Sequence, residues 1–282
     1  MLKLSIALVL ILVALIMGGY YWGQSSWKSS MQALQARLVA DQETASVDVF
    51  SSQELDGLPA PVRRYFEAVL NEGQPLIRSA EVKHTGLFNM GATEENWQPF
   101  TSEQQVVTRP RGFIWDARIR MAPGFTVSVV DAYVAGHGLL EAKLLGLITV
   151  MKQPPSSELD QGELLRFFAE TPWYPTALLP SQGVTWHAID DHSASATLTD
   201  QGITVSLTLS FNEAGLIDEV YSEARYRDVD GEQVATPWQG RFWEYERRDG
   251  LLVPLSGEVA WLLPEGPKPY WRGRITDIRY LY

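Results

Sequence analysis

One of the four histidines lies in a cluster of side chains that could do chemistry. His192 follows Asp190 and Asp191 directly, and His187 stands three residues before Asp190. A histidine beside carboxylates can act as a general base or bind a metal ion. Asp and Ser also favour turns, and the flanking sequence alternates like strands, so a hairpin tip explains the same composition. We expect the hairpin tip.

A second candidate is a carboxylate on the apolar face of a strand. Asp131 and Tyr133 share the alternation of Phe125, Val127 and Val129. A carboxyl group on an apolar face has a raised pKa, which makes it a candidate site. The alternative, which we favour, is that Asp131 lies near the strand end and pairs with an arginine.

The segment Asp228-Val229-Asp230-Gly231 invites a calcium interpretation, but it lacks the further oxygen ligands of a loop site. Asp-Gly is a strong hairpin signal, so we predict a turn. The charged residues of the last strands are predicted to form cross-strand pairs on a solvated face. They are Glu219, Glu223, Arg225, Arg227, Arg241, Glu244, Arg272 and Arg274.

Several function classes are excluded or disfavoured by composition. The 282 residues include no cysteine, which excludes disulfides, thiolate metal sites and a thiol nucleophile. The formal net charge of -11 disfavours binding to nucleic acid, because the phosphate backbone would be repelled. Familiar signatures such as G-x-S-x-G, H-E-x-x-H and G-x-G-x-x-G are absent from the sequence. We therefore predict neither a cofactor nor a metal site.

The N-terminus carries the clearest targeting signal. Leu4 to Trp22 is a run of 19 residues without a charged side chain, about 28 Å as a helix, and it ends in Tyr20-Tyr21-Trp22. That length nearly covers a bilayer core, and the aromatic residues are typical of the membrane interface. Gly18–Trp22 offers no small-x-small cleavage site, so residues 1–24 are predicted to be an uncleaved transmembrane anchor rather than a signal peptide.

Two features of the sequence favour opposite orientations of the anchor in the membrane. Lys28 and Arg37 follow the helix and only Lys3 precedes it, which under the positive-inside rule disfavours a cytoplasmic N-terminus. A head of three residues cannot hold a domain, so we predict a single-pass protein of the bacterial inner membrane with the bulk of the chain outside the cytoplasm. Residues 25–56 are predicted to be a membrane-proximal helix, covering Met31–Val39, followed by a linker.

Residues 57–282 have the pattern of an antiparallel β domain. A short helix opens it, with Pro61 in the first turn. About four strands are expected between Ile77 and Met151 and seven from Gly183 to the end, as in the strict alternation of residues 203–211. A helical insertion at residues 160–180 separates them. The predicted fold class is mainly β (α+β), a large curved antiparallel sheet of about eleven strands, a half-barrel, that the insertion covers.

The insertion combines a helix with a proline-rich apolar segment. Asp160 and Glu163 have the spacing of a capping box, with Asp in place of Ser. Prolines at 172 and 175 then flank Trp173 and Tyr174. A segment this apolar must bury its side chains against the sheet, enter lipid or close a cavity.

Several short segments of the sequence resemble those of an uncharacterised bacterial family, a domain of unknown function. They are GLPAPVRRYF, WQPF, GELLRFFAETPWYPTALLP, PWQGRF and PYWRG, and the resemblance extends from Gly57 to Tyr282. It implies a bacterial origin and brings no known activity. The order of elements is also similar to the LolA-like half-barrels, which are lipoprotein carriers that curl about eleven strands around an apolar groove. That likeness is one of fold alone.

The anchor, the sheet–helix–sheet order and the Trp173 segment favour a membrane-anchored protein that binds a lipid or another apolar ligand and is not an enzyme. One alternative is a scaffold with a filled core that recognises an envelope protein through a strand edge or an aromatic patch. Another is a hydrolase that uses Asp131 and His137, or the cluster at 190–192. The residues expected to line the groove are Phe113, Trp115, Val127, Val129, Trp173, Tyr174, Leu207 and Leu209.

Overall fold

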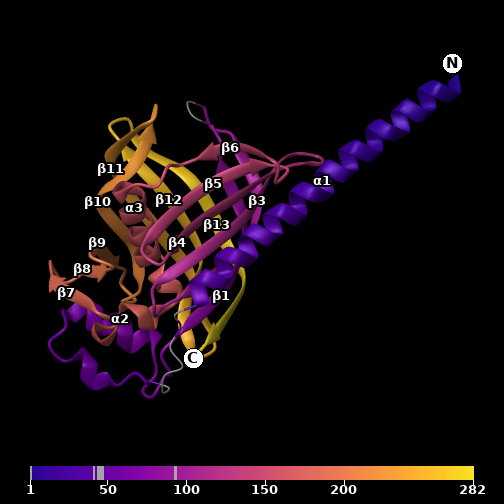
Figure 1. The fold of residues 1–282 in the computed structure, drawn as a ribbon. Helices are drawn as coiled ribbons and strands as arrows, with labels where there is room; N and C mark the ends of the chain where they lie inside the picture. Colours follow the sequence, from indigo (N-terminus) through magenta and orange to yellow (C-terminus); the bar gives the residue numbers. More distant parts are fainter. Residues whose placement is uncertain (1, 41, 43–47, 92–93) are drawn as a thin grey trace.

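The structure is a computed structural model that describes residues 2–40, 42, 48–91 and 94–282 (Figure 1). Residues 41 and 43–47 of the predicted linker therefore lie outside the described part. One large sheet dominates the fold, and helices lie on both of its faces and at one end.

The sheet has 13 antiparallel strands in the order β6-β5-β4-β3-β2-β1-β13-β12-β11-β10-β9-β8-β7. Two meanders, β1–β6 and β7–β13, join where β1 pairs with β13, with Val82 opposite Ile278. Most strands bury alternate side chains on the concave face, and β4 is buried on both faces because α1 covers its outer side. The strands are β1 (Ser79–Asn89), β2 (Trp97–Val107), β3 (Gly112–Ala122), β4 (Phe125–Val134), β5 (His137–Leu144), β6 (Ile148–Lys152), β7 (Val184–Ala188), β8 (Ser193–Asp200), β9 (Ile203–Phe211), β10 (Ile217–Val229), β11 (Glu232–Arg248), β12 (Leu251–Leu263) and β13 (Gly266–Leu281).

The predicted fold class is confirmed, and the seven strands after Gly183 are all present. The first meander has six strands instead of about four. Its β2 contains Pro99 and a polar run through Gln105, and all five residues of β6 are exposed. Neither strand shows the apolar alternation from which strands are predicted: two of the inward residues of β2, Ser102 and Gln104, are polar, and β6 is a short edge strand.

Three α-helices accompany the sheet. The first, α1, is continuous over Leu2–Val39 and packs with its C-terminal half on β3 and β4. The second, α2 (Ala60–Val69), has Pro61 in its first turn as predicted and buries Val62, Tyr65, Phe66 and Val69. The third, α3 (Ser157–Ala169), contacts β3, β4 and β5 from one meander and β9 and β10 from the other. It therefore bridges the two ends of the curved sheet.

The predicted capping box at Asp160 and Glu163 is wrong. The cap of α3 is Ser156, whose side chain accepts a hydrogen bond from the Leu159 amide, so the helix begins three residues earlier than predicted. The carboxylate of Asp160 instead accepts from the amide of Gly138 on β5, which ties α3 to the sheet. Three short 3₁₀ helices follow α3, namely η2 (Thr171–Trp173), η3 (Pro175–Leu178) and η4 (Pro180–Gln182). A further one, η1 (Ser52–Leu55), precedes α2.

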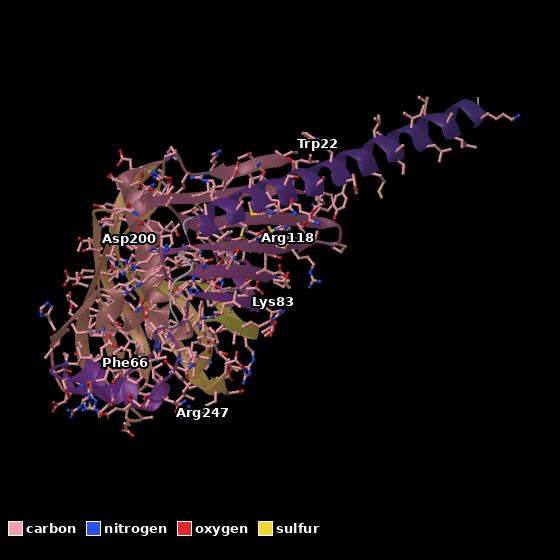
Figure 2. All side chains as sticks on the ribbon, turned by 60° about the horizontal axis from the view of Figure 1, so that its bottom comes forward. Trp22, Phe66, Lys83, Arg118, Asp200 and Arg247 are labelled. Atoms are coloured by element: carbon pink, nitrogen blue, oxygen red, sulfur yellow. The ribbon has the colours of Figure 1, made fainter. Side chains whose placement is uncertain are left out.

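The sheet has two separate apolar layers. The larger one lies on the concave face, under α2, α3 and the 3₁₀ segment. The smaller one lies on the opposite face, where Trp27, Met31, Leu34 and Leu38 of α1 pack on outward-pointing residues of β2, β3 and β4. Figure 2 shows α1 running along the sheet and then leaving it beyond Trp22.

Candidate functional site

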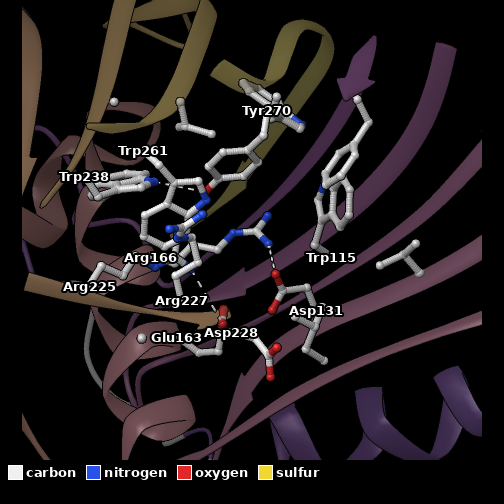
Figure 3. A pocket seen from close by; sticks show the side chains of 18 of the residues that line it. Trp115, Asp131, Glu163, Arg166, Arg225, Arg227, Asp228, Trp238, Trp261 and Tyr270 are labelled. Carbon is white, nitrogen blue, oxygen red and sulfur yellow. Dashed lines mark hydrogen bonds and ion pairs between the residues drawn. The ribbon is translucent and has the colours of Figure 1, made fainter. Parts of the chain in front are cut away.

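A cavity of about 670 Å³ lies between α3 and the concave face of the sheet. Its size falls within the range of about 300–1,000 Å³ that is usual for small-molecule sites. Apolar side chains from both meanders form most of its wall, and a group of charged side chains crosses it (Figure 3). The apolar part includes Trp115 and Ile119 of β3, Val127 and Val129 of β4, and Trp173 of η2.

Arg166 of α3 is the centre of the first charged group. Its guanidinium makes an ion pair with Asp131 of β4, and its Nε lies 2.9 Å from Glu170 Oε1. The same guanidinium lies over the rings of Phe113 and Trp115, 4.9 and 5.1 Å from their centroids. Burial by itself lowers the pKa of Arg166, but the carboxylates of Glu170 and Asp131 outweigh that effect and raise it. Arg166 is therefore a fixed cation that joins the helix to the sheet.

Arg225 of β10 forms the second charged group, on the other side of the cavity (Figure 3). It lies over the rings of Trp238 and Trp261, at 5.3 and 5.7 Å, and donates a hydrogen bond to the Tyr270 hydroxyl over 3.0 Å. Arg225 is 9% exposed. The prediction that it belongs to a solvated face is wrong. The pairs Arg272–Glu258 and Arg274–Glu244 are cross-strand pairs as predicted.

Glu163 of α3 lies between the two groups. Its Oε1 is 3.6 Å from Arg225 Nη2, while Oε2 is buried without a hydrogen-bond donor among the described residues, as is Asp131 Oδ1. Burial and the nearby charge of Asp131 raise the pKa of Glu163 well above its usual value, against the opposing effect of Arg225. A proton on Glu163 gives Asp131 the donor that it lacks. Its surroundings in the cavity wall thus favour the protonated form of Glu163.

His84 lies behind this wall, in contact with two of the cavity's tryptophans. Its ring centroid is 5.0 Å from that of Trp173 and 5.9 Å from that of Trp271, and Nδ1 lies 3.3 Å from Ser102 Oγ. Burial lowers the pKa of His84 to about 3, helped by the charge of Arg166. The imidazole is therefore neutral at physiological pH, and it packs as an uncharged polar ring against the two tryptophans.

Residues 56–280 match DUF6920, a family of unknown function. The chain belongs to this family. The sequence resemblance, which extended from Gly57 to Tyr282, is thereby confirmed. The structure is also similar to a LolA superfamily protein from Nitrosomonas europaea, with 10% sequence identity and a TM-score of 0.42 over 83% of this chain and 94% of that one. No curated protein matches the chain.

The structure places the predicted groove residues of this DUF6920 member in two settings. Four of the eight line the cavity, and the other four are packed in the apolar layer outside its lining. Those in the lining are Trp115, Val127, Val129 and Trp173. Those in the packed layer are Phe113, Tyr174, Leu207 and Leu209.

The sequence analysis singled out Asp131 but did not place the other polar residues in the cavity. Glu163, Arg166 and the C-cap residue Glu170 follow one another at spacings of three and four in residues 163–170, where every other residue is apolar, and this places them on one face. That spacing was a usable signal. Arg225 gave no such signal, because a β-bulge between Ser222 and Arg225 shifts its side chain to the inner face.

In the structure, the residues of the other candidate sites form turns and ion pairs. The amide of His192 donates to Asp190 Oδ1 over 2.8 Å, so this cluster forms the expected exposed turn. Asp230 and Gly231 have positive φ values of 54° and 86° and form the predicted hairpin turn. Asp131 pairs with Arg166 as expected, and His137 Nδ1 lies 3.6 Å from Asp160 Oδ2 instead. Within the described ranges, no group of three His, Cys, Asp or Glu residues could hold a metal ion.

Proposed function

We propose that this protein is a membrane-anchored envelope protein that binds a lipid or another apolar ligand in the cavity under α3. The observation that carries the proposal is the cavity itself. A scaffold with a filled core would have no space of about 670 Å³ walled by aromatic and branched side chains. Apolar walls favour an acyl or similarly apolar ligand, since such a ligand loses contact with water on binding.

The ligand's polar end would meet the charged groups. Arg225 and Tyr270 offer donors, and Glu163 offers a proton or an acceptor, all on the lining of the same cavity. A few polar groups in an apolar pocket fix the orientation of a ligand and make it specific. A ligand with an apolar chain and a small polar head fits this distribution.

The anchor is supported by α1. Among the described residues, one helix, α1, is long and apolar enough to cross a membrane; its candidate span is Ser5–Val39, with a mean hydropathy of 2.1 in the most apolar window. The large side chains of Ile6–Trp22 that the structure describes are exposed, which suits contact with lipid. We propose a single pass through the bacterial inner membrane, with the β domain outside the cytoplasm.

The test is native mass spectrometry with organic extraction on the full chain, purified in a mild detergent. We expect a lipid bound in defined stoichiometry. Val129→Trp places an indole in the cavity and should abolish retention, whereas Val49→Trp, at a residue that is 54% exposed, should retain it. A ligand-free mass for the wild type, or equal retention by Val129→Trp, would contradict the proposal.

A further inference from the structure

The end of the sheet nearest the apolar part of α1 carries exposed apolar side chains. Phe125 begins β4 and Ile148 begins β6, and the Leu145 amide between them donates to the Thr126 carbonyl over 2.9 Å, so the two strand ends are adjacent. Phe125 is 53% exposed and Ile148 is 62% exposed. Together with Met121 and Val150, which are also exposed, these residues form what we term the tip patch. Contiguous exposed apolar residues mark contact with a membrane or a partner.

The tip patch is fixed to α1 at one level of the helix. Gln24 Nε2 donates to the Leu145 carbonyl over 3.2 Å, in the turn between β5 and β6. The absence of a side chain at Gly23 permits this approach, since a Cβ there would lie 2.7 Å from the Leu145 carbonyl oxygen. The turn therefore meets α1 directly after Trp22, at the last of the three aromatic residues that end the apolar run (Figure 2).

This contact sets the depth of the patch. If α1 crosses a bilayer, Tyr20–Trp22 lie at the interface, and neighbouring helix residues differ in depth by only about 1.5 Å. The turn that touches Gly23 and Gln24 is then at the level of the headgroups. The residues that flank it cannot avoid the membrane surface.

The strands that carry the tip patch are close to neutral, which is compatible with contact with a bilayer. Residues 112–152, which contain β3 to β6, have four basic and three acidic residues, in a chain with 23 basic and 34 acidic ones. Anionic lipids would repel most of the acidic surface, and this segment avoids that repulsion. The apolar and electrostatic properties of the tip patch thus agree on a lipid surface.

The patch also reaches the cavity. Val150 and Met151 of β6 are exposed and line the cavity at the same time, and Met90, after β1, does so too. β6 is the edge strand of the sheet, so no further strand separates this rim from its surroundings. A lipid that leaves the bilayer beside α1 would meet the rim of the cavity first.

We propose that the tip patch docks on the surface of the bilayer that α1 crosses, and that the cavity is loaded past β6 directly from the membrane. This inference rests on the proposed function for its anchor. The bilayer is the occupant, and the ligand is drawn from its lipids.

The test uses the absence of cysteine from the chain. Single variants Ile148→Cys in the tip patch and Ile189→Cys in the turn after β7 would carry an NBD fluorophore. Both positions are exposed isoleucines, at 62% and 54%. A third variant, Ala14→Cys, reports insertion of α1. The full chain is reconstituted in phosphatidylcholine–phosphatidylglycerol vesicles with lipids that carry a doxyl quencher, and circular dichroism checks that each variant is folded.

We expect severalfold stronger quenching at position 148 than at 189 by a quencher near the headgroups, and quenching at position 14 by a deeper one. Quenching at 14 with equal, weak quenching at 148 and 189 would overturn the docking and leave the anchor intact. A blue-shifted but unquenched probe at 148 would indicate a protein neighbour and also overturn it. Weak quenching at 14 would refute the anchor itself, while ligand retention in the cavity would still be decided by mass spectrometry.

Discussion

The guanidinium of Arg225 and the carboxyl group of Glu163 form an ion pair in the cavity wall, with 3.6 Å between Nη2 and Oε1. One comes from β10 in the second meander and the other from α3, which is tied to the first meander through Arg166 and Asp131. This contact joins the two halves of the sheet through a helix. Because burial and the charge of Asp131 raise the pKa of Glu163, the strength of this contact depends on pH.

The first prediction concerns Glu163→Gln. The pKa of Glu163 is higher in the folded state than its ordinary value of 4.5, so the folded protein binds the extra proton. The wild type should therefore lose stability as pH rises from about 4.5 through the folded pKa, and Gln, which resembles the protonated acid, should remove that loss. Denaturant unfolding of the full chain in detergent should give equal stabilities near pH 4.5 and a more stable variant at higher pH.

Glu170→Gln is the matched control for that variant. Glu170 lies on the same face of α3, and its carboxylate binds both Arg166 and Gln104. Breaking a fully buried ion pair costs about 3–5 kcal/mol. This pair is partly exposed and Arg166 keeps Asp131, so the change should destabilise the protein at neutral pH by less than that. The change in stability caused by Glu170→Gln need not equal that caused by Glu163→Gln in size. Destabilisation by Glu163→Gln at every pH would show that Glu163 is ionised in the folded state.

The second prediction has the opposite sign. The pKa of His84 falls from 6.5 to about 3 on folding, so the unfolded chain binds the proton more tightly. Stability should decrease as pH falls below about 6.5, by up to about 1.4 kcal/mol for each pH unit. His84→Gln should flatten this part of the stability profile. His192→Gln, in an exposed turn, should leave the slope unchanged; the same flattening by both variants would assign the slope to another cause.

The outer framework of the fold could be predicted because its signals are local. The apolar face of α2, from Val62 to Val69, and the alternation of β9 are properties of one segment each. The contact of α1 with the sheet was not predicted, although Trp27, Met31, Leu34 and Leu38 recur at helical spacing. The apolar run before them hid that stripe, since a membrane helix needs no amphipathic face.

The apolar half of the site could be predicted, and so could the pairing of Asp131 with an arginine. Trp115, Val127 and Val129 follow the alternation of their strands to the cavity wall. Arg225 does not, because the bulge after Ser222 changes the face on which its side chain lies. The meeting of Arg225 with Glu163 joins residues of different meanders, and such a contact has no trace in the spacing of either segment.

The third prediction concerns Trp173, which the sequence placed in an apolar connection of unknown role. Its indole is 3% exposed and packs edge-on against Phe242, with 5.9 Å between the centroids, while Tyr280 Oη donates to its backbone carbonyl over 2.7 Å. Trp173→Ala should lower the free energy of unfolding by about 3–5 kcal/mol, because it leaves a void beside the cavity.

Trp243→Ala is the control for Trp173→Ala. Trp243 is 44% exposed on β11, so its removal should cost at most about 0.5 kcal/mol. Denaturant unfolding measures both. If Trp173→Ala cost no more than Trp243→Ala, the 3₁₀ segment would be a loosely held cover and not a part of the packed core.

The last prediction tests whether the membrane-proximal helix belongs to the β domain. Trp27 donates to Asp116 Oδ1 over 3.0 Å, and the Arg118 guanidinium lies 5.4 Å from its ring centroid. Each of the four buried side chains of this stripe should contribute about 1.5–3 kcal/mol through burial alone.

A chain that begins at Ser25 keeps the stripe and lacks the apolar run, whereas one that begins at Asp48 lacks both. We expect the longer chain to be monomeric, and the shorter one to melt at a lower temperature and to self-associate, because Ile114, Val130 and their neighbours become exposed. Calorimetry and sedimentation of the two chains give the measurement. Equal melting temperatures and two monomers would mean that α1 only tethers the sheet; the expected difference would make residues 25–39 a structural part of the domain, which holds the tip patch at a fixed height beside the apolar helix.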